Sequence, residues 1–161
     1  MTSKLFALTL AALTILGPQT TNAEPREGGT VAGTWMVSTQ ITENAPPGVP
    51  LRFRALHTYA SDGRFIDRNT QPQALTSAGH GEWYPLGKGR FALTFVFFSF
   101  TPTGDHAATI KVRTTIQLND FGDEWSGRFS AQAYSPDGTP LGPPAIGTHS
   151  GKRLVNEPLD E

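Results

Sequence analysis

His57 and Asp67 are the two residues of this sequence whose chemistry is most suggestive, because we expect them to lie side by side. The triplet Ser61-Asp62-Gly63 separates two runs in which apolar and polar residues alternate. A three-residue loop that ends in glycine usually forms a type I turn with a bulge, which fixes the strand register. That register pairs His57 with Asp67, and a carboxylate beside an imidazole can orient the ring and stabilise its charged form. The pair indicates either acid–base chemistry or a structural polar pair, and we favour the structural pair.

His80 and Glu82 are a second pair, with the alternate spacing that places both on one face of a strand. A metal site needs at least a third ligand, and nothing in the spacing brings His57, His106 or His149 to them. A solvated strand face is the favoured interpretation, so we expect no metal and no cofactor. The sequence also has no phosphate-binding glycine loop, nucleophile-elbow serine or dinucleotide fingerprint.

The hairpin around Ser61-Asp62-Gly63 has one arginine-rich face, which must point to water. The residues of that face are Arg52, Arg54, Arg64 and Arg68. The opposite face, which we therefore expect to point inward, carries Phe53, Ala55, His57, Tyr59, Phe65, Asp67 and Asn69.

A second hairpin surrounds Gly87-Lys88-Gly89, where the same rule pairs Leu86 with Arg90 and Trp83 with Leu93. Its more apolar face is expected inside and carries Gly81, Trp83, Phe91, Leu93, Phe95 and Phe97. His80 and Glu82 then lie outside. Some large apolar residues of this hairpin are left over, which suggests a homodimer contact through residues near Phe98.

The whole chain follows a strand–turn pattern without a convincing helical period. The expected strands are 31–41, 51–60, 64–69, 81–86, 90–100, 107–118, 124–134 and 146–155. Proline-rich and polar loops separate them, notably 43–50 and 70–79. About eight strands of this length predict an all-β fold, a single up-and-down antiparallel barrel, with an open sandwich as the alternative.

Residues 1–23 are typical of a signal peptide, which leaves 24–161 as one domain. The apolar part of that segment is too short for a stable membrane span, and a buried N-terminal helix is the alternative interpretation. The sequence has no cysteine, so an exported protein of this kind must be stabilised by packing and sheet closure. This favours a bacterial protein that is secreted or periplasmic. A formal net charge of −1 gives no electrostatic reason to expect nucleic acid as a partner.

A Gly-x-Trp motif, Gly33-Thr34-Trp35, lies on the expected first strand, and Arg153 lies on the last. With these residues, and with the segments 79–83 and 91–95, the chain resembles the lipocalin-like (calycin) barrels. The resemblance implies that the tryptophan closes the barrel floor, that the arginine packs across it, and that a small apolar molecule is bound. The chain departs from many lipocalins, because it has no obvious helix after the barrel and no cysteine pair.

Three functions remain open at this point. The first is binding of a small hydrophobic or amphipathic molecule in a barrel lumen. The expected lining is Phe53, His57, Tyr59, Trp83, Phe95, Phe97 and Phe129. The second is an isomerase, cyclase or lyase that uses His57 and Asp67 as an acid–base pair. The third is a structural or interaction module that presents Phe98 and its neighbours to a partner.

Overall fold

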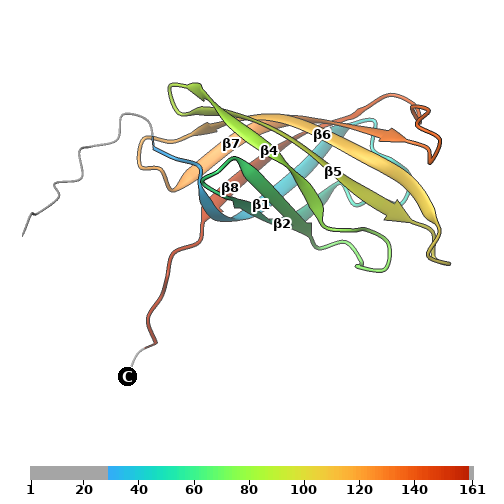
Figure 1. The fold of residues 1–161 in the computed structure, drawn as a ribbon, viewed down its shortest axis with the longest axis horizontal. Helices are drawn as coiled ribbons and strands as arrows, with labels where there is room; N and C mark the ends of the chain where they lie inside the picture. Colours follow the sequence, from blue (N-terminus) through green and yellow to red (C-terminus); the bar gives the residue numbers. More distant parts are fainter. Residues whose placement is uncertain (1–28, 160–161) are drawn as a thin grey trace, which may run out of the picture.

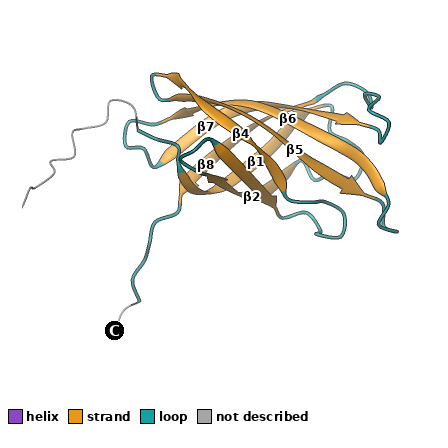
Figure 2. Cartoon of the chain, viewed as in Figure 1, coloured by secondary structure: helices purple, strands orange, loops and turns teal. Residues whose placement is uncertain are grey.

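Eight antiparallel strands form one closed sheet in the computed structural model, which describes residues 29–159 (Figure 1). The strands are β1 (Gly33–Glu43), β2 (Arg52–Tyr59), β3 (Arg64–Asn69), β4 (Gly79–Gly87), β5 (Arg90–Phe100), β6 (His106–Leu118), β7 (Glu124–Tyr134) and β8 (Ala145–Arg153). Each strand pairs with the next along the chain, and β8 pairs with β1. Figure 2 shows strands and loops only, with no helix among the described residues. The predicted all-β up-and-down barrel is confirmed, and the open sandwich is wrong. The expected signal segment lies outside the described residues.

The two ends of the barrel differ in the length of their connections. Short turns join β2 to β3, β4 to β5 and β6 to β7 at the end where the chain enters β1, on the left of Figure 1. Three longer loops, 44–51, 70–78 and 135–144, lie at the opposite end together with the five-residue connection 101–105. The first end is closed by side chains, and we call the second the open end.

Trp35 and Arg153 pair across the seam where the barrel closes. The guanidinium carbon of Arg153 lies 4.2 Å from the centroid of the Trp35 ring, a cation–π contact. The guanidinium also donates to three backbone carbonyls, from Nε to Gly122, from Nη1 to Ala32 and from Nη2 to Thr30. The indole Nε1 is satisfied as well, because it donates to the carbonyl of Val31. Arg153 therefore links three segments, which are the residues just before β1, β1 itself and the β6–β7 turn.

Gly33 explains the glycine of the Gly-x-Trp motif. Its φ of 131° lies in the region that other residues rarely adopt. A Cβ at this position would also lie 2.7 Å from Nη1 of Arg153. Glycine is required here by both the backbone and the arginine.

Inward and outward faces follow the predicted alternation. His57 pairs with Asp67 and Tyr59 with Phe65, so the register predicted for the first hairpin is confirmed. All four arginines of this hairpin lie on its outer face. The inward faces of β6 and β7 supply further core residues, among them Val112, Ile116 and Phe129.

The second hairpin corrects one predicted pair. Trp83 pairs with Leu93 as expected, but Arg90 pairs with Gly87 and not with Leu86. Lys88 and Gly89 both have positive φ values, 53° and 68°, which is the geometry of a two-residue type I′ turn. The extra residue is absorbed as a bulge before Gly87. The rule for three-residue loops did not apply because the glycine before the turn belongs to the strand.

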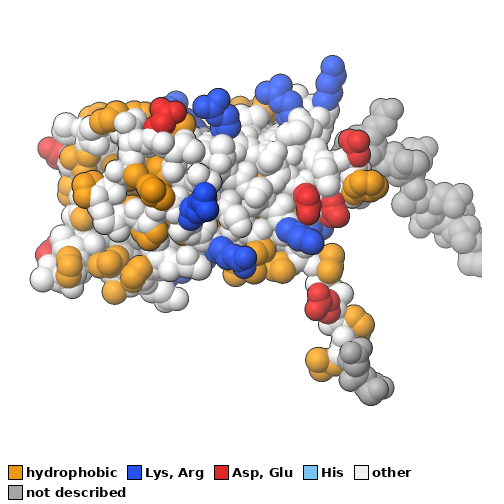
Figure 3. All heavy atoms as spheres, turned by 180° about the vertical axis from the view of Figure 1, so that it is seen from behind, with side chains coloured by type: hydrophobic (Ala, Val, Ile, Leu, Met, Phe, Trp, Pro, Cys, Tyr) orange, Lys and Arg blue, Asp and Glu red, His pale blue; other side chains and the backbone are white. Residues whose placement is uncertain are grey.

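The outer wall carries most of the positive charge of the described residues. Seen from behind in Figure 3, Lys and Arg side chains are spread along the wall, whereas Asp and Glu lie toward the two ends. Phe98 also points outward, with 46% of its surface exposed, as the predicted faces require. The dimer contact near Phe98 stays a prediction.

Candidate ligand cavity

A cavity of about 630 Å³ occupies the half of the barrel next to the open end. Its walls are mainly apolar and come from most of the strands; they include Ile41, Phe53, Ala55, Phe95, Phe97, Ala108, Ile110, Val112, Phe129, Ala131, Ala133 and Ala145. Loop residues such as Pro46, Pro47, Leu141 and Pro143 border it at the open end. A space of this size and lining suits a small ligand.

The polar floor of this cavity consists of His57, Asp67 and His149. Nε2 of His57 lies 3.2 Å from Oδ1 of Asp67, with only 4% and 5% of the two side chains exposed. Their strands place them together because β2 and β3 pair in the register set by the tight turn. Gly79 on β4 leaves the room for this, since a Cβ there would lie 3.0 Å from Cβ of Asp67.

Aromatic rings hold the His57 imidazole in place. Phe65 contacts it edge-on, with ring centroids 5.0 Å apart, and Trp125 stacks on it at 5.9 Å. Nδ1 of His57 lies 3.4 Å from the hydroxyl of Tyr59. Burial raises the pKa of Tyr59, and the negative charge of Asp67 raises it further, so this hydroxyl keeps its proton. Both nitrogens of His57 therefore have protein partners.

His149 reaches the floor from β8, between two inward-facing glycines, Gly147 and Gly151. Its Nε2 lies 2.7 Å from the hydroxyl oxygen of Thr114, and its ring centroid lies 4.8 Å from that of Trp125. Burial, and to a smaller extent the neighbouring His57, lowers the pKa of His149 from 6.5 to about 3. His149 is therefore neutral at ordinary pH.

The residues predicted to line a lumen divide into two groups. Phe53, His57, Phe95, Phe97 and Phe129 line the cavity. Tyr59 and Trp83 do not, because they lie in the closed half of the barrel. Tyr59 is 1% exposed, and the indole Nε1 of Trp83 donates to the carbonyl of Ala60. The closed half is filled by an aromatic layer that consists of Trp35, Tyr59, Trp83, Phe91 and Trp125.

Several polar residues of the cavity were not anticipated from the sequence as lining, and His149 and Thr76 are the most buried of them. His149 was weighed only as a metal ligand, although the alternation of Gly147, His149 and Gly151 marks an inward face. Thr76 lies on the β3–β4 loop, where no periodicity indicates direction. It is 4% exposed, lines the cavity, and its hydroxyl has no hydrogen-bond partner among the described residues.

His80 and Glu82 point outward from β4 and are exposed, as the predicted faces require. Within residues 29–159, no group of three side chains is arranged to hold a metal ion. The same part of the chain contains no helix with the length and hydropathy needed to cross a membrane.

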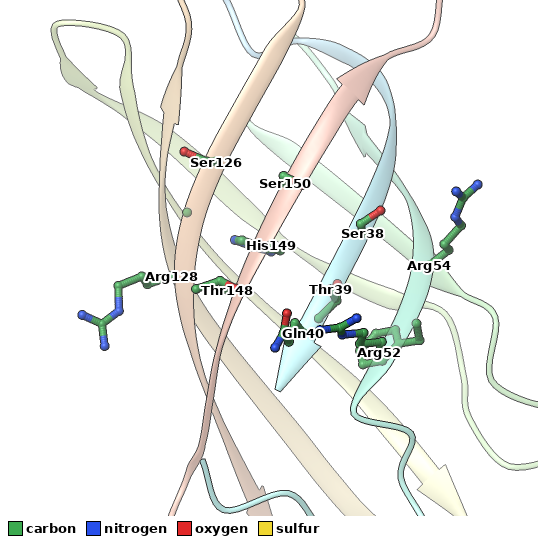
Figure 4. A pocket seen from close by; sticks show the side chains of 12 residues that line it. Ser38, Thr39, Gln40, Arg52, Arg54, Ser126, Arg128, Thr148, His149 and Ser150 are labelled. Carbon is green, nitrogen blue, oxygen red and sulfur yellow. The ribbon is translucent and has the colours of Figure 1, made fainter. Parts of the chain in front are cut away.

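A second hollow, of about 850 Å³, lies on the outside of the wall over β7, β8, β1 and β2 and is open to solvent (Figure 4). Its outward-facing lining is polar and consists of Ser38, Gln40, Ser126, Thr148 and Ser150 together with Arg52, Arg54 and Arg128. Figure 4 shows the side chains of Arg54 and Arg128 directed away from it on either side. It gathers no buried polar group of its own on the outer surface, so the lumen is the better candidate site.

Comparison with family models, with curated proteins and with solved structures finds no match for this chain. The geometry of the lumen is therefore what indicates the function of this chain.

Proposed function

We propose that this protein is an exported, lipocalin-like binding protein that holds a small hydrophobic or amphipathic molecule in its lumen. The single observation that carries the proposal is the apolar cavity of about 630 Å³ above the polar floor. Pockets that bury small ligands have volumes of roughly 300 to 1,000 Å³ and combine apolar walls with a few placed polar groups.

The distribution of side-chain sizes supports this proposal. The closed half is filled by large rings, whereas alanines line much of the other half. Apolar space inside a protein lowers stability by about 24 cal/mol per Å³ in core truncation series. A barrel that served only as a scaffold would gain stability from larger residues at Ala55, Ala131 or Ala133. The retained space is better explained by an occupant.

Export and membership of the calycin group are parts of the same proposal. The segment 1–23 has the composition of a signal peptide, and the closed eight-stranded barrel with Trp35 beneath Arg153 has the form that the resemblance implies. A secreted or periplasmic location also agrees with stabilisation that needs no cysteine.

The test is a fluorescence titration with N-phenyl-1-naphthylamine, a neutral apolar dye that brightens in apolar surroundings. We expect saturable binding to the wild type. Ala131→Trp places an indole in the cavity and should weaken dye binding at least tenfold. Ser130→Trp puts the same side chain on the adjacent outward-facing position and serves as the matched control. Equal binding by both variants would place the dye outside the lumen and end the proposal.

An enzyme on the same barrel is the second candidate, favoured by the buried contact between His57 and Asp67 at the cavity floor. An aspartate that orients an imidazole is a common acid–base arrangement. The mature protein would be incubated with a lipid extract of the producing cells, and the products followed by mass spectrometry. A compound consumed by the wild type but not by His57→Asn supports an isomerase, cyclase or lyase. Compounds that are bound and returned unchanged support the binding protein.

A further inference from the structure

The polar floor and the rings around it contain hydrogen-bonding atoms that the protein itself does not use, and a proton count shows what one of them, Nδ1 of His149, can do. The hydroxyl of Thr114 lies 2.8 Å from the carbonyl oxygen of Arg128, and a carbonyl can only accept. The single proton of that hydroxyl is therefore donated to Arg128. Toward Nε2 of His149, at 2.7 Å, the same oxygen must accept.

His149 is consequently held with its proton on Nε2. In a neutral imidazole the other nitrogen then carries a lone pair and accepts hydrogen bonds. Nδ1 of His149 has no hydrogen-bond partner within residues 29–159. It is not one of the fully buried unpaired side-chain atoms, so it keeps some accessible surface. A bound molecule that donates a hydrogen bond can therefore be accepted by Nδ1 of His149.

The charges around the floor disfavour an anionic group. The lining of the cavity contains no lysine and no arginine. Its one formal negative charge, on Asp67, is in contact with His57, so this pair carries either no net charge or one negative charge. His149 adds no positive charge, because burial keeps its pKa low. A carboxylate brought to this floor would be buried without a cation, which is costly.

The geometry points to a neutral, hydroxyl-bearing apolar molecule as the ligand, whose O–H donates to Nδ1 of His149. This inference deepens the proposed function and rests on it. It predicts that alcohols and phenols with an apolar body bind more tightly than fatty acids of the same chain length. The hydroxyl of Thr76 on the wall is also unpaired, but its oxygen is fully buried, and a hydroxyl can donate or accept, so it does not distinguish between ligand classes.

Displacement of bound N-phenyl-1-naphthylamine by decanol, decanoate and decylamine tests the inference at pH 7.5. These competitors share one chain and differ only in the head group. We expect decanol to displace the dye at a concentration at least tenfold lower than decanoate does. Decanoate that competes as well as decanol, or decylamine that competes better, would overturn the inference. If the dye still binds in the lumen while the competitors show the wrong order, the head-group inference fails but the proposed binding function stands. The failure of the inference can therefore be told apart from the failure of the proposed function.

Two variants locate the effect. His149→Phe keeps a ring of similar shape but removes the acceptor, and it should weaken decanol about three- to tenfold, the range for one neutral hydrogen bond, without weakening dye binding. Asp67→Asn removes the negative charge, and it should narrow the gap between decanoate and decanol. Asp120→Asn, on the exposed β6–β7 turn, is the control for the change of charge. An unchanged head-group preference in both His149→Phe and Asp67→Asn would contradict the assignment, and circular dichroism confirms that each variant is folded.

Discussion

The guanidinium carbon of Arg153 lies 4.2 Å from the centre of the Trp35 ring, so a single side chain on the last strand covers the tryptophan of the first. Because β1 and β8 are hydrogen-bonded neighbours, this contact lies on the seam where the sheet closes. The lumen exists only because that seam is closed. The stability of the seam is therefore the physical condition for any ligand binding.

Arg153→Met is expected to destabilise the fold by about 2–4 kcal/mol, because it removes a cation–π contact and three hydrogen bonds to carbonyls. Urea unfolding at pH 7 measures the change. Arg128→Met, on the outer face of β7, is the matched control and should change the free energy of unfolding little. Equal midpoints for the two variants would show that the seam does not depend on Arg153.

Gly33→Ala should destabilise the fold more than Gly48→Ala does. Both glycines have positive φ values, 131° and 77°, but only at Gly33 would a Cβ meet Arg153. Each variant bears roughly 1–3 kcal/mol of backbone strain. In the background of Arg153→Met the cost of Gly33→Ala should fall, which a double-mutant cycle detects. A cost that is the same with and without Arg153 would rule out the collision.

Asp67→Asn should lower the free energy of unfolding by roughly 2–3 kcal/mol, because it breaks a buried pair and leaves His57 without its carboxylate partner. Asp62→Asn breaks the ion pair with Arg64, which is exposed to solvent, and should have little effect. Thermal unfolding of both variants at pH 7 compares them. A larger loss of stability in Asp62→Asn would contradict the claim that the buried pair of His57 and Asp67 stabilises the fold more than the exposed ion pair does.

Stability should fall as the pH drops below 6.5, and His149 should account for part of the loss. The unfolded chain binds a proton on this histidine near pH 6.5, whereas the folded protein binds it only near pH 3. Below pH 6.5 the unfolded state therefore binds more protons, which destabilises the fold. Between pH 6.5 and 5 this contribution is about 1–2 kcal/mol.

His149→Gln removes that contribution, so its free energy of unfolding should depend less on pH over this window. His106→Gln is the control, because His106 is exposed on β6. His57 and Asp67, the titratable groups that line the cavity with His149, are kept in all three proteins. Identical pH dependence for the wild type and His149→Gln would contradict a buried, neutral His149.

The barrel and the faces of its strands could be predicted because turn residues and alternation are local signals. Ser61-Asp62-Gly63 fixed the register of β2 and β3, and that register placed His57 beside Asp67. The seam needed a long-range guess, that Arg153 meets Trp35, and closure of the sheet confirmed it. The error at Leu86 arose because a glycine can belong either to a turn or to the strand before it.

The depth of the cavity could not be predicted from alternation. Periodicity shows that Tyr59 and Trp83 point inward, but it does not show how far a tilted strand carries them toward the closed end. The role of His149 was missed for a related reason, since its contact with Thr114 crosses β7 and depends on the tilt of three strands. Thr76 lies in a loop, and loop geometry has no period to read.

A crystal structure of the protein with 10-bromodecan-1-ol tests the central claim most directly, because anomalous scattering locates the bromine without ambiguity. We expect the bromine inside the barrel, toward the open end, and the hydroxyl within hydrogen-bond distance of Nδ1 of His149. Bromine found only on the outer wall, with the lumen of the soaked crystal closed by its own side chains, would contradict the account.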